Sequence, residues 1–261
     1  MKERLRPLKA LRALRYARQV ANWPDVFRAY LRNRDVQRLV LRSGVRWQAH
    51  GNVPLMGLFN EVWRHDCYRL RQAPLAGEAT VIDIGANVGV FAVLVATELR
   101  ARRVYAFEPS PQAADDLAAN VAANKLEDKV FIRRMAVAGS RDTRAFAVTE
   151  SQVMNRIVAS GEANKQAVLV PTTTLEAIFR DEGIEWCDFL KVDCEGSEYE
   201  IVLTAPDWVL RRVGRIALEW HRVKGHGPWE IAERLRRTDF KVEVDERPGA
   251  WLGYIFATGV A

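Results

Sequence analysis

Cysteine is scarce in this sequence, and the three cysteines show neither the paired spacing of a metal site nor a disulfide framework: Cys67, Cys187 and Cys194. No run approaches the roughly twenty consecutive apolar residues that are needed to cross a bilayer. The N-terminus alternates leucine with arginine, so it also lacks the apolar block of a signal peptide. We therefore expect a soluble protein of a reducing compartment, the cytoplasm.

Acidic residues are scarce only near the N-terminus. Residues 1–46 hold thirteen lysines and arginines against three acids, a net charge of +10, whereas residues 47–261 hold 26 basic and 30 acidic residues, a net charge of −4. We expect residues 1–46 to form a solvated, basic, helical arm, with peripheral contact to an anionic membrane surface as the alternative. Nucleic acid is a less suitable partner, because the aromatic residues of this segment follow no binding-module pattern.

The rest of the chain alternates strand and helix patterns, which is typical of a parallel sheet with crossover helices. We divide the chain into a helical arm and lead-in over residues 1–70, without a strong β pattern, and an α/β domain over residues 71–261. An insertion at residues 144–170 predicts a hairpin that pairs Ala145–Val148 with Ala167–Val170. The domain itself has seven predicted strands: Thr80–Ile84, Arg103–Phe107, Val130–Met135, Asp188–Val192, Arg215–Glu219, Lys241–Asp245 and Gly253–Thr258.

A glycine-bearing turn between an apolar strand and a helix points to a nucleoside site. The strand carries Asp83 near its end, and the turn contains Gly85, Asn87 and Gly89. Glycine allows the backbone angles of such a turn and lets a ligand approach the bare chain. Glu108 follows the next strand and is placed to accept hydrogen bonds from two ribose hydroxyls. Because the turn lacks the G-x-G-x-x-G spacing that holds a pyrophosphate, it favours a cationic ligand without phosphates, such as S-adenosylmethionine.

A second group of polar residues follows two later strands. Asp193 and Glu195 come directly after one buried strand, and the next strand ends with Glu219 and His221. Ligands bind outside the carboxyl ends of the strands in open α/β sheets, so we expect these side chains to face the same crevice as the glycine turn. The segment Ser197–Glu200 has the S-x-x-E spacing of a capping box and predicts the start of a helix.

Taken together, these motifs resemble the FkbM family of S-adenosylmethionine-dependent methyltransferases. VIDIGANVG resembles the cofactor loop of that family, YAFEPSP its ribose-binding strand end, VPTTTLEAI a helix-opening segment and FLKVDCEGSE its second signature. The likeness covers residues 58–221 and does not extend to the arm. It implies a class I, Rossmann-like fold with a seven-stranded, mostly parallel sheet, and methyl transfer to a hydroxyl oxygen. It also implies that Glu61, Tyr68 and Ala136 contact the cofactor.

Methyl transfer from a sulfonium needs no protein nucleophile, so the protein's main task is positioning, with a general base as a second contribution. His221 is the first candidate for that base, because a neutral imidazole titrates near working pH. Asp193 and Glu195 are the further catalytic candidates. In an alternative mechanism, Asp193 and Glu219 hold Mg²⁺, which lowers the pKa of the substrate hydroxyl.

Three classes of function follow from these patterns. The first is an S-adenosylmethionine-dependent O-methyltransferase that acts on a small molecule, a sugar or a glycolipid. The second is a nucleotide-binding oxidoreductase, and the third is a non-catalytic, cofactor-binding partner protein. The sequence favours the first, because its motifs occur together and in the order of the family they resemble.

Overall fold

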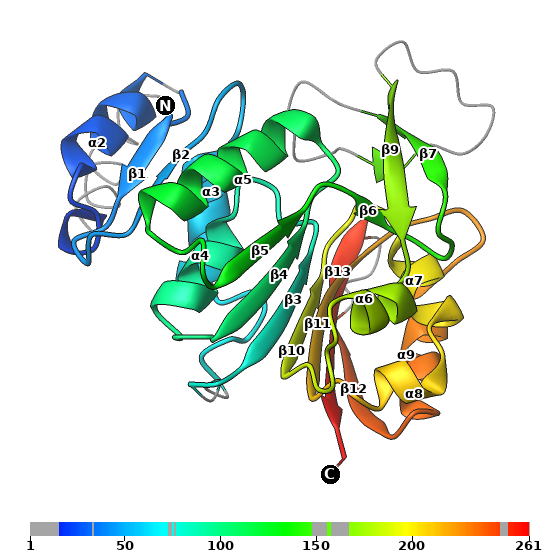
Figure 1. Ribbon diagram of the computed structural model, residues 1–261. Coiled ribbons are helices and arrows are strands. Elements are labelled where there is room, and N and C mark those ends of the chain that lie inside the picture. Colours follow the sequence, from blue (N-terminus) through cyan, green and yellow to red (C-terminus); the bar gives the residue numbers. More distant parts are fainter. Residues whose placement is uncertain are drawn as a thin grey trace.

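The protein is built around a seven-stranded sheet with helices on both faces (Figure 1). The computed structural model describes residues 16–32, 34–72, 75, 77–147, 156–157, 167–245 and 250–260. Among these strands, β13 is antiparallel to both of its neighbours and the other six run parallel to one another. The spatial order of the strands is β12 (Phe240–Asp245), β13 (Leu252–Gly259), β11 (Arg215–His221), β10 (Phe189–Val192), β3 (Thr80–Ile84), β4 (Arg103–Phe107) and β5 (Val130–Arg133).

This order confirms the predicted class I, Rossmann-like architecture, and each of the seven predicted strands is present within a few residues of its expected bounds. The chain leaves β3 toward β4 on one side and later returns to β10 on the other side. The carboxyl ends of β3 and β10 therefore flank a topological switch point, where ligands bind in open α/β sheets.

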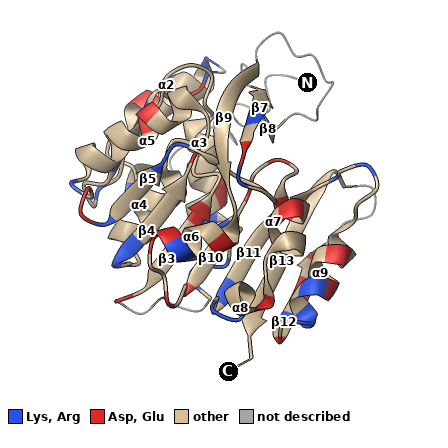
Figure 2. Cartoon of the chain, turned by 45° about the vertical axis from the view of Figure 1, so that its right-hand side comes forward, with Lys and Arg blue, Asp and Glu red and all other residues tan. Residues whose placement is uncertain are grey.

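The sheet separates two hydrophobic cores, because successive strand residues point to opposite faces. Val81 and Val104 belong to one core, and Ile82 and Tyr105 belong to the other. The first core contains α4 (Val90–Thr97) and α5 (Pro111–Ala123) together with the N-terminal elements. The second core contains four helices, which lie on the right in Figure 1: α6 (Leu175–Asp181), α7 (Glu198–Thr204), α8 (Asp207–Leu210) and α9 (Pro228–Arg236). The acidic first turn of α7 is visible in red in Figure 2.

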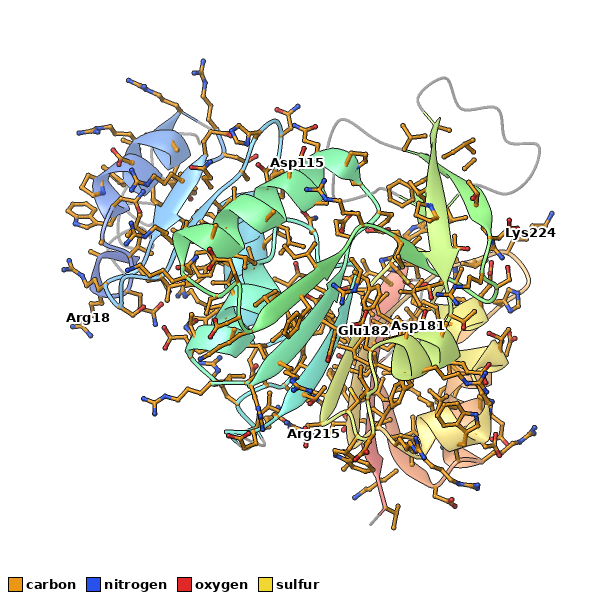
Figure 3. The ribbon with its side chains drawn as sticks, in the orientation of Figure 1. Arg18, Asp115, Asp181, Glu182, Arg215 and Lys224 are labelled. Atoms are coloured by element: carbon orange, nitrogen blue, oxygen red, sulfur yellow. The ribbon has the colours of Figure 1, made fainter. Side chains whose placement is uncertain are left out.

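The N-terminal segment contains a β-hairpin beside its helical elements, which corrects the expectation of a purely helical arm and lead-in over residues 1–70. Its strands β1 (Arg38–Val40) and β2 (Arg46–Gln48) are three residues each, too short to produce a visible alternation in the sequence. Helical elements precede and follow the hairpin: η2 (Tyr16–Arg18), α2 (Trp23–Leu31), α3 (Leu55–Phe59) and the π-helical turn η3 (Asn60–Arg64). Arg18 lies at the far side of the molecule from Lys224 (Figure 3). Residues 1–15 of the basic arm lie outside the described residues, so its membrane contact stays a prediction.

Asn120 in α5 and Asn124 at its C-terminal cap form the hydrogen bonds with the backbone of β2 that a neighbouring strand would form. Asn120 Oδ1 accepts a hydrogen bond from the Gln48 N–H (2.8 Å), and its Nδ2 donates to the carbonyls of Gln48 (2.8 Å) and Val88 (2.9 Å). Asn124 exchanges two equivalent bonds with the Arg46 backbone. The spacing of the two asparagines fits the spacing of Arg46 and Gln48, because four residues of a helix rise about 6.0 Å and two residues of a strand rise about 6.6 Å. The helix thereby attaches the N-terminal segment to the domain and to the glycine turn.

We expect Asn120→Ala to lower the free energy of unfolding by about 2–3 kcal/mol, since it leaves the buried carbonyl of Val88 and the part-buried backbone groups of Gln48 without these partners. Asn124→Ala is the matched control, because Asn124 makes similar bonds in a half-buried position where water can replace them. Urea denaturation of both variants measures the difference. Equal losses in the two variants would contradict a special role for Asn120.

The predicted insertion hairpin is confirmed and is part of a larger sheet. Strands β7 (Thr143–Ala147) and β9 (Ala167–Thr173) pair antiparallel, with Ala145 opposite Leu169. β6 (Ala136–Val137) and β8 (Arg156–Ile157) complete a four-stranded sheet in the order β6, β9, β7, β8. Across the described ranges, no helix is both long and apolar enough to span a membrane.

Candidate active site

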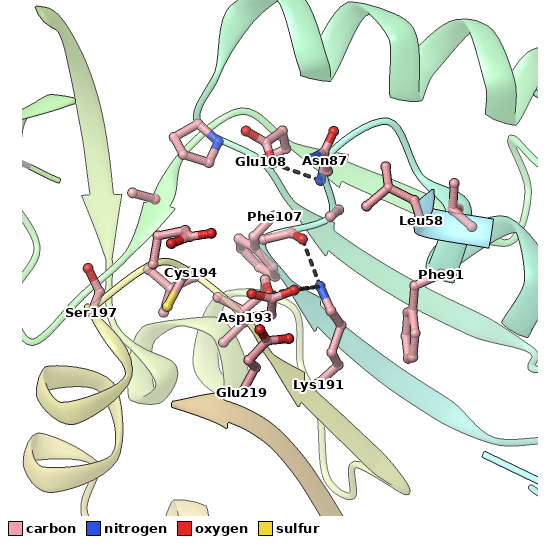
Figure 4. A pocket seen from close by; sticks show the side chains of 18 of the residues that line it. Leu58, Asn87, Phe91, Phe107, Glu108, Lys191, Asp193, Cys194, Ser197 and Glu219 are labelled. Atoms are coloured by element: carbon pink, nitrogen blue, oxygen red, sulfur yellow. Dashed lines mark hydrogen bonds and ion pairs between the residues drawn. The ribbon is translucent and has the colours of Figure 1, made fainter. Parts of the chain in front are cut away.

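A cavity lies at the carboxyl ends of β3, β4, β10 and β11, at the switch point of the sheet (Figure 4). The lead-in contributes residues to its wall, and so does the insertion sheet, through Phe146 and Ile157. Most of the residues predicted as site residues line this cavity: Glu61, Tyr68, Gly85, Asn87, Glu108, Ala136, Asp193, Glu195 and Glu219. Asp83, Gly89 and His221 do not line it. Most of the predicted residues therefore meet at one cavity, and their roles in binding and catalysis stay predictions.

The two glycines of the turn are required by protein packing. Gly85 has φ +78°, and a Cβ at this position would lie 1.7 Å from the Asp193 carbonyl oxygen. Gly89 has φ +83°, and its Cβ would lie 2.4 Å from Leu117 Cδ1 on α5. Close approach of the Asp193 backbone and of α5 therefore requires glycine at these positions, and the approach of a ligand to the turn stays a prediction. Any larger residue at Gly85 would push apart the two loops that form the floor of the cavity.

Glu108 is held in a fixed orientation by two backbone N–H groups. Its Oε2 accepts from the Asn87 N–H and its Oε1 from the Ser110 N–H, both at 2.8 Å. Burial raises the pKa of Glu108 to about 7, against the lowering effect of these two hydrogen bonds. Each carboxylate oxygen keeps a lone pair for a further donor. Glu108 is therefore a preoriented double acceptor at the cavity wall, as predicted for a ribose-binding acid.

Asp83 faces a buried lysine. Its side chain is fully buried, and Lys191 Nζ lies 3.0 Å from Oδ1. Lys191 also donates a 2.7 Å hydrogen bond to the Gly85 carbonyl, so it anchors the glycine turn. Burial raises the pKa of Asp83, and the Lys191 charge limits the rise. Burial lowers the pKa of Lys191, but the charges of Asp83 and Asp193 outweigh it and leave that pKa above its ordinary value. Asp83 does not line the cavity itself but pairs with Lys191, which does.

Lys191 was not among the predicted site residues, although the sequence carries a signal for it. It is the one charged residue within the otherwise apolar strand Phe189–Val192, and all four residues of this strand are buried. A lysine in a strand covered on both faces needs a counter-charge. Asp83 occupies the paired position on the neighbouring strand β3.

The inner end of the cavity carries a cluster of carboxylates. Asp193 Oδ2 accepts a 2.8 Å hydrogen bond from the Tyr68 hydroxyl, and Glu61 Oε1 accepts one of 3.2 Å from Tyr254. Burial, followed by repulsion from Asp193, raises the pKa of Glu61 above its ordinary value and the pKa of Glu219 to about 8. Figure 4 shows Asp193 and Glu219 close to each other and apart from Glu108. The cluster would be stabilised by a bound positive charge.

His221 lies behind this cluster and is oriented by a buried glutamate. Its Nδ1 is 2.9 Å from Glu198 Oε1, and its Nε2 is 3.4 Å from Glu195 Oε2 and 3.8 Å from Glu219 Oε1. Burial lowers the pKa of His221, but the hydrogen bond and charge of Glu198, together with the other acids, outweigh burial and raise the pKa to about 9. His221 is therefore cationic at neutral pH, which removes the basis for predicting it as a neutral general base.

The loop that leads into α7 also differs from the prediction. Ser197 precedes the helix without a side-chain capping bond, so the predicted capping box is absent. Instead, Glu198 is turned into the core, where it also accepts from the Cys194 N–H (3.2 Å). Glu195 has φ +56° and Gly196 has φ +113°, a left-handed pair that turns the chain sharply after β10. This turn brings Glu195 to the cavity and Glu198 beneath it.

The ring of His221 is expected to titrate with a midpoint near pH 9, and Glu198→Gln is expected to lower that midpoint toward 6.5. The folded state holds this proton more tightly than the unfolded chain. The interaction therefore stabilises the fold fully below pH 6.5 and is lost as the pH rises through about 9. Ring-proton NMR measures the midpoint, with His221→Asn to assign the signal. A midpoint below pH 7 in the parent protein would refute the ion-paired arrangement.

The predicted metal site can be tested against the chemistry of its donor atoms. One ligand atom each of Asp193, Glu219 and His221 lie within 4.8 Å of one another, as a single ion would need. However, two cations of the chain already face this group, because Lys191 Nζ lies 3.7 Å from Asp193 Oδ2 and His221 is protonated. Mg²⁺ also prefers an octahedral shell of oxygen ligands. The residues do not fit Mg²⁺ in this arrangement, and we derive no step through a metal ion.

Comparison with known proteins gives a consistent match. A family model for the methyltransferase FkbM domain matches residues 83–242. The methyltransferase sdnD of Sordaria araneosa is 24% identical over 236 residues, which cover 79% of this chain and 90% of that protein. The 31-O-demethyl-FK506 methyltransferase FkbM of Streptomyces tacrolimicus is 23% identical over 218 residues, which cover 73% of this chain and 84% of that protein.

Two further matches differ in extent. The AMB antimetabolite synthetase AmbE of Pseudomonas aeruginosa is 24% identical over 225 residues, which span 72% of this chain but 11% of that much longer protein. A solved structure of an rRNA methylase from Streptococcus thermophilus aligns with a TM-score of 0.48 at 13% identity, over 76% of this chain and 96% of that chain.

Proposed function

The chain belongs to the FkbM methyltransferase family, and from this premise we propose that it transfers a methyl group from S-adenosylmethionine to a hydroxyl oxygen of a small molecule, sugar or glycolipid. One observation carries the choice of this methyl donor. The cavity at the switch point is lined by five acidic side chains, and Lys191 is the one lysine or arginine among its described lining residues. Such a wall attracts a sulfonium and repels the pyrophosphate of a dinucleotide.

The described residues fit the parts of this donor. Glu108 keeps a lone pair on each oxygen for two ribose hydroxyls, and the glycine turn beside it leaves room for a nucleoside. Glu61 and Asp193, on the other side, supply negative charge for the sulfonium and the amino group. When bound, S-adenosylmethionine supplies a methyl group that its sulfonium has already activated. The protein then has to hold the acceptor oxygen in line and receive its proton.

We propose Glu219 as the group that receives the acceptor's proton. It lines the cavity, whereas His221 does not. Its pKa of about 8 leaves only a minor fraction ionised at neutral pH, and that carboxylate is a stronger base than the carboxylate of an ordinary glutamate. Asp193 lines the cavity beside it, where its Oδ2 accepts a hydrogen bond from the Tyr68 hydroxyl. The cationic His221 lies behind Glu219 and also contacts Glu195. Glu198 holds the imidazole in place through a hydrogen bond to Nδ1. His221 is thus proposed as a positioning residue.

Calorimetric titration with S-adenosylhomocysteine, with NADH as the control ligand, tests the proposed function. We expect S-adenosylhomocysteine to bind and NADH not to bind, because the carboxylate-lined cavity opposes a diphosphate. Transfer of labelled methyl from S-adenosylmethionine to a panel of neutral alcohols and glycosides then tests catalysis. EDTA is expected to leave both binding and transfer unchanged. Binding of NADH alone would favour an oxidoreductase, and cofactor binding without transfer to any acceptor would favour a non-catalytic partner protein.

A further inference from the structure

The four-stranded insertion sheet places a row of apolar side chains on the face that adjoins the cavity. Phe146 on β7 is paired with Ile157 on β8 and with Val168 on β9. Directly opposite residues of antiparallel strands point to the same face of a sheet. Phe146 and Ile157 line the cavity, so Val168 lies on the cavity face as well. The row Ile157–Phe146–Val168 therefore starts inside the cavity and continues to Val168, which is 36% exposed.

The other face of the same sheet provides a direct comparison. Leu169, the next residue along β9, points away from the cavity face and is 76% exposed. The middle of the row is covered by the protein itself, since Phe146 packs with Val170 and Ala136 in a small core against which Ile157 is partly buried. Apolar side chains that are half-covered at one end and exposed at the other form an open-ended apolar wall, which suits an elongated ligand.

The charge of the cavity restricts what such a ligand can carry. Its described lining residues include Glu61, Glu108, Asp193, Glu195 and Glu219, and the charge of Lys191 is matched by Asp83 at 3.0 Å. No other lysine or arginine occurs among these lining residues. Lys191 and His221, the two cations next to these acids, are already paired with the buried acids Asp83 and Glu198. A phosphate or carboxylate on the acceptor would therefore meet the remaining acids without a cation of its own. An uncharged acceptor meets no such cost.

We propose that the row Ile157–Phe146–Val168 binds the apolar body of an uncharged, hydroxyl-bearing acceptor, while the carboxylates of the cavity exclude anionic acceptors. The inference rests on the proposed function, because it places the acceptor hydroxyl at the carboxylate cluster of the same cavity. It assigns the acceptor to neutral amphiphiles that carry an apolar body next to the reacting hydroxyl. It assigns specificity to residues of the insertion sheet.

The test uses two probes that share an alkyl chain and differ in their head group. n-Octyl-β-D-glucoside and n-octyl phosphate are titrated calorimetrically, below their micelle concentrations, into protein saturated with S-adenosylhomocysteine. We expect the glucoside to bind at least tenfold more tightly than the phosphate. n-Hexyl-β-D-glucoside is expected to bind about fifteenfold more weakly than the octyl compound, since it lacks two methylenes and each buried methylene contributes about fourfold. Equal or tighter binding of the phosphate, or no binding of the glucosides, would overturn the proposal.

Two neighbouring positions of β9 give matched variants. Val168→Ser is expected to weaken binding of octyl glucoside about tenfold, whereas Leu169→Ser, on the opposite face, leaves it unchanged. Both side chains are exposed, so neither change threatens folding. Ile157→Ser repeats the test inside the cavity. Equal effects of the two β9 variants would contradict the assigned face. Saturation with S-adenosylhomocysteine is measured first, so a failure of the proposed function is seen separately, as an absence of that first binding step.

Discussion

Asp83→Ala is expected to lower the free energy of unfolding by about 3–5 kcal/mol, because it leaves the ammonium of Lys191 buried without its counter-charge. The side chains of Asp83 and Lys191 are 0% and 4% exposed, and their charged atoms lie 3.0 Å apart. Water therefore cannot replace the missing carboxylate. Urea denaturation followed by circular dichroism measures the loss.

The double variant Asp83→Ala, Lys191→Met distinguishes an unpaired charge from a simple cavity. Replacing both partners of a buried ion pair with apolar residues is often close to neutral, so most of the stability should return. Arg102→Ala serves as the surface control, because it breaks the exposed ion pair with Glu78 and should cost less than about 1 kcal/mol. A single Asp83→Ala variant within 1 kcal/mol of the parent protein would contradict the buried pair.

Glu108→Ala is expected to weaken S-adenosylhomocysteine binding by at least about 100-fold while the protein stays folded. Hydrogen bonds to a charged group contribute about 1.5–3 kcal/mol each, and the proposal gives Glu108 two of them. Calorimetric titration measures the affinity. Glu108→Gln is also expected to bind poorly, because its amide N–H₂ would face the N–H of either Asn87 or Ser110.

Asp115→Ala is the control for Glu108, since Asp115 is an exposed acid on α5 that pairs with Arg134. Its removal should not change the affinity. A folded Glu108→Ala protein that binds S-adenosylhomocysteine within threefold of the parent would remove Glu108 from the cofactor site and with it the main support for the proposed donor.

Features that depend on a local sequence pattern could be predicted from the sequence. The strands of the main sheet carry continuous apolar runs, and the glycine turn has a distinctive local pattern, so both were placed within a few residues. Glu108 could be assigned because the end of β4 follows directly from the strand pattern. The β1–β2 hairpin could not be predicted, because its strands are short and its backbone bonds to Asn120 and Asn124, more than seventy residues away.

Contacts between segments that are distant in the sequence could not be predicted either. The sequence shows that Lys191 lies in an apolar strand, but only the register of β3 with β10 places Asp83 beside it. Likewise, the sequence suggests His221 as a general base because a free imidazole titrates near neutral pH, and only the fold places three carboxylates around it. The insertion was visible, yet only its register shows which face adjoins the cavity.

The sequence by itself determined the family, the class I fold and the edge of the sheet where the site lies, because these depend on local hydrophobic patterns and short motifs. The tertiary structure decided which acids face the cavity, which charge each one neutralises and which histidine nitrogen meets which carboxylate. The physical reason is that burial and electrostatic coupling act through space at distances of a few ångströms. Separation along the chain carries no information about those distances until the strands are in register.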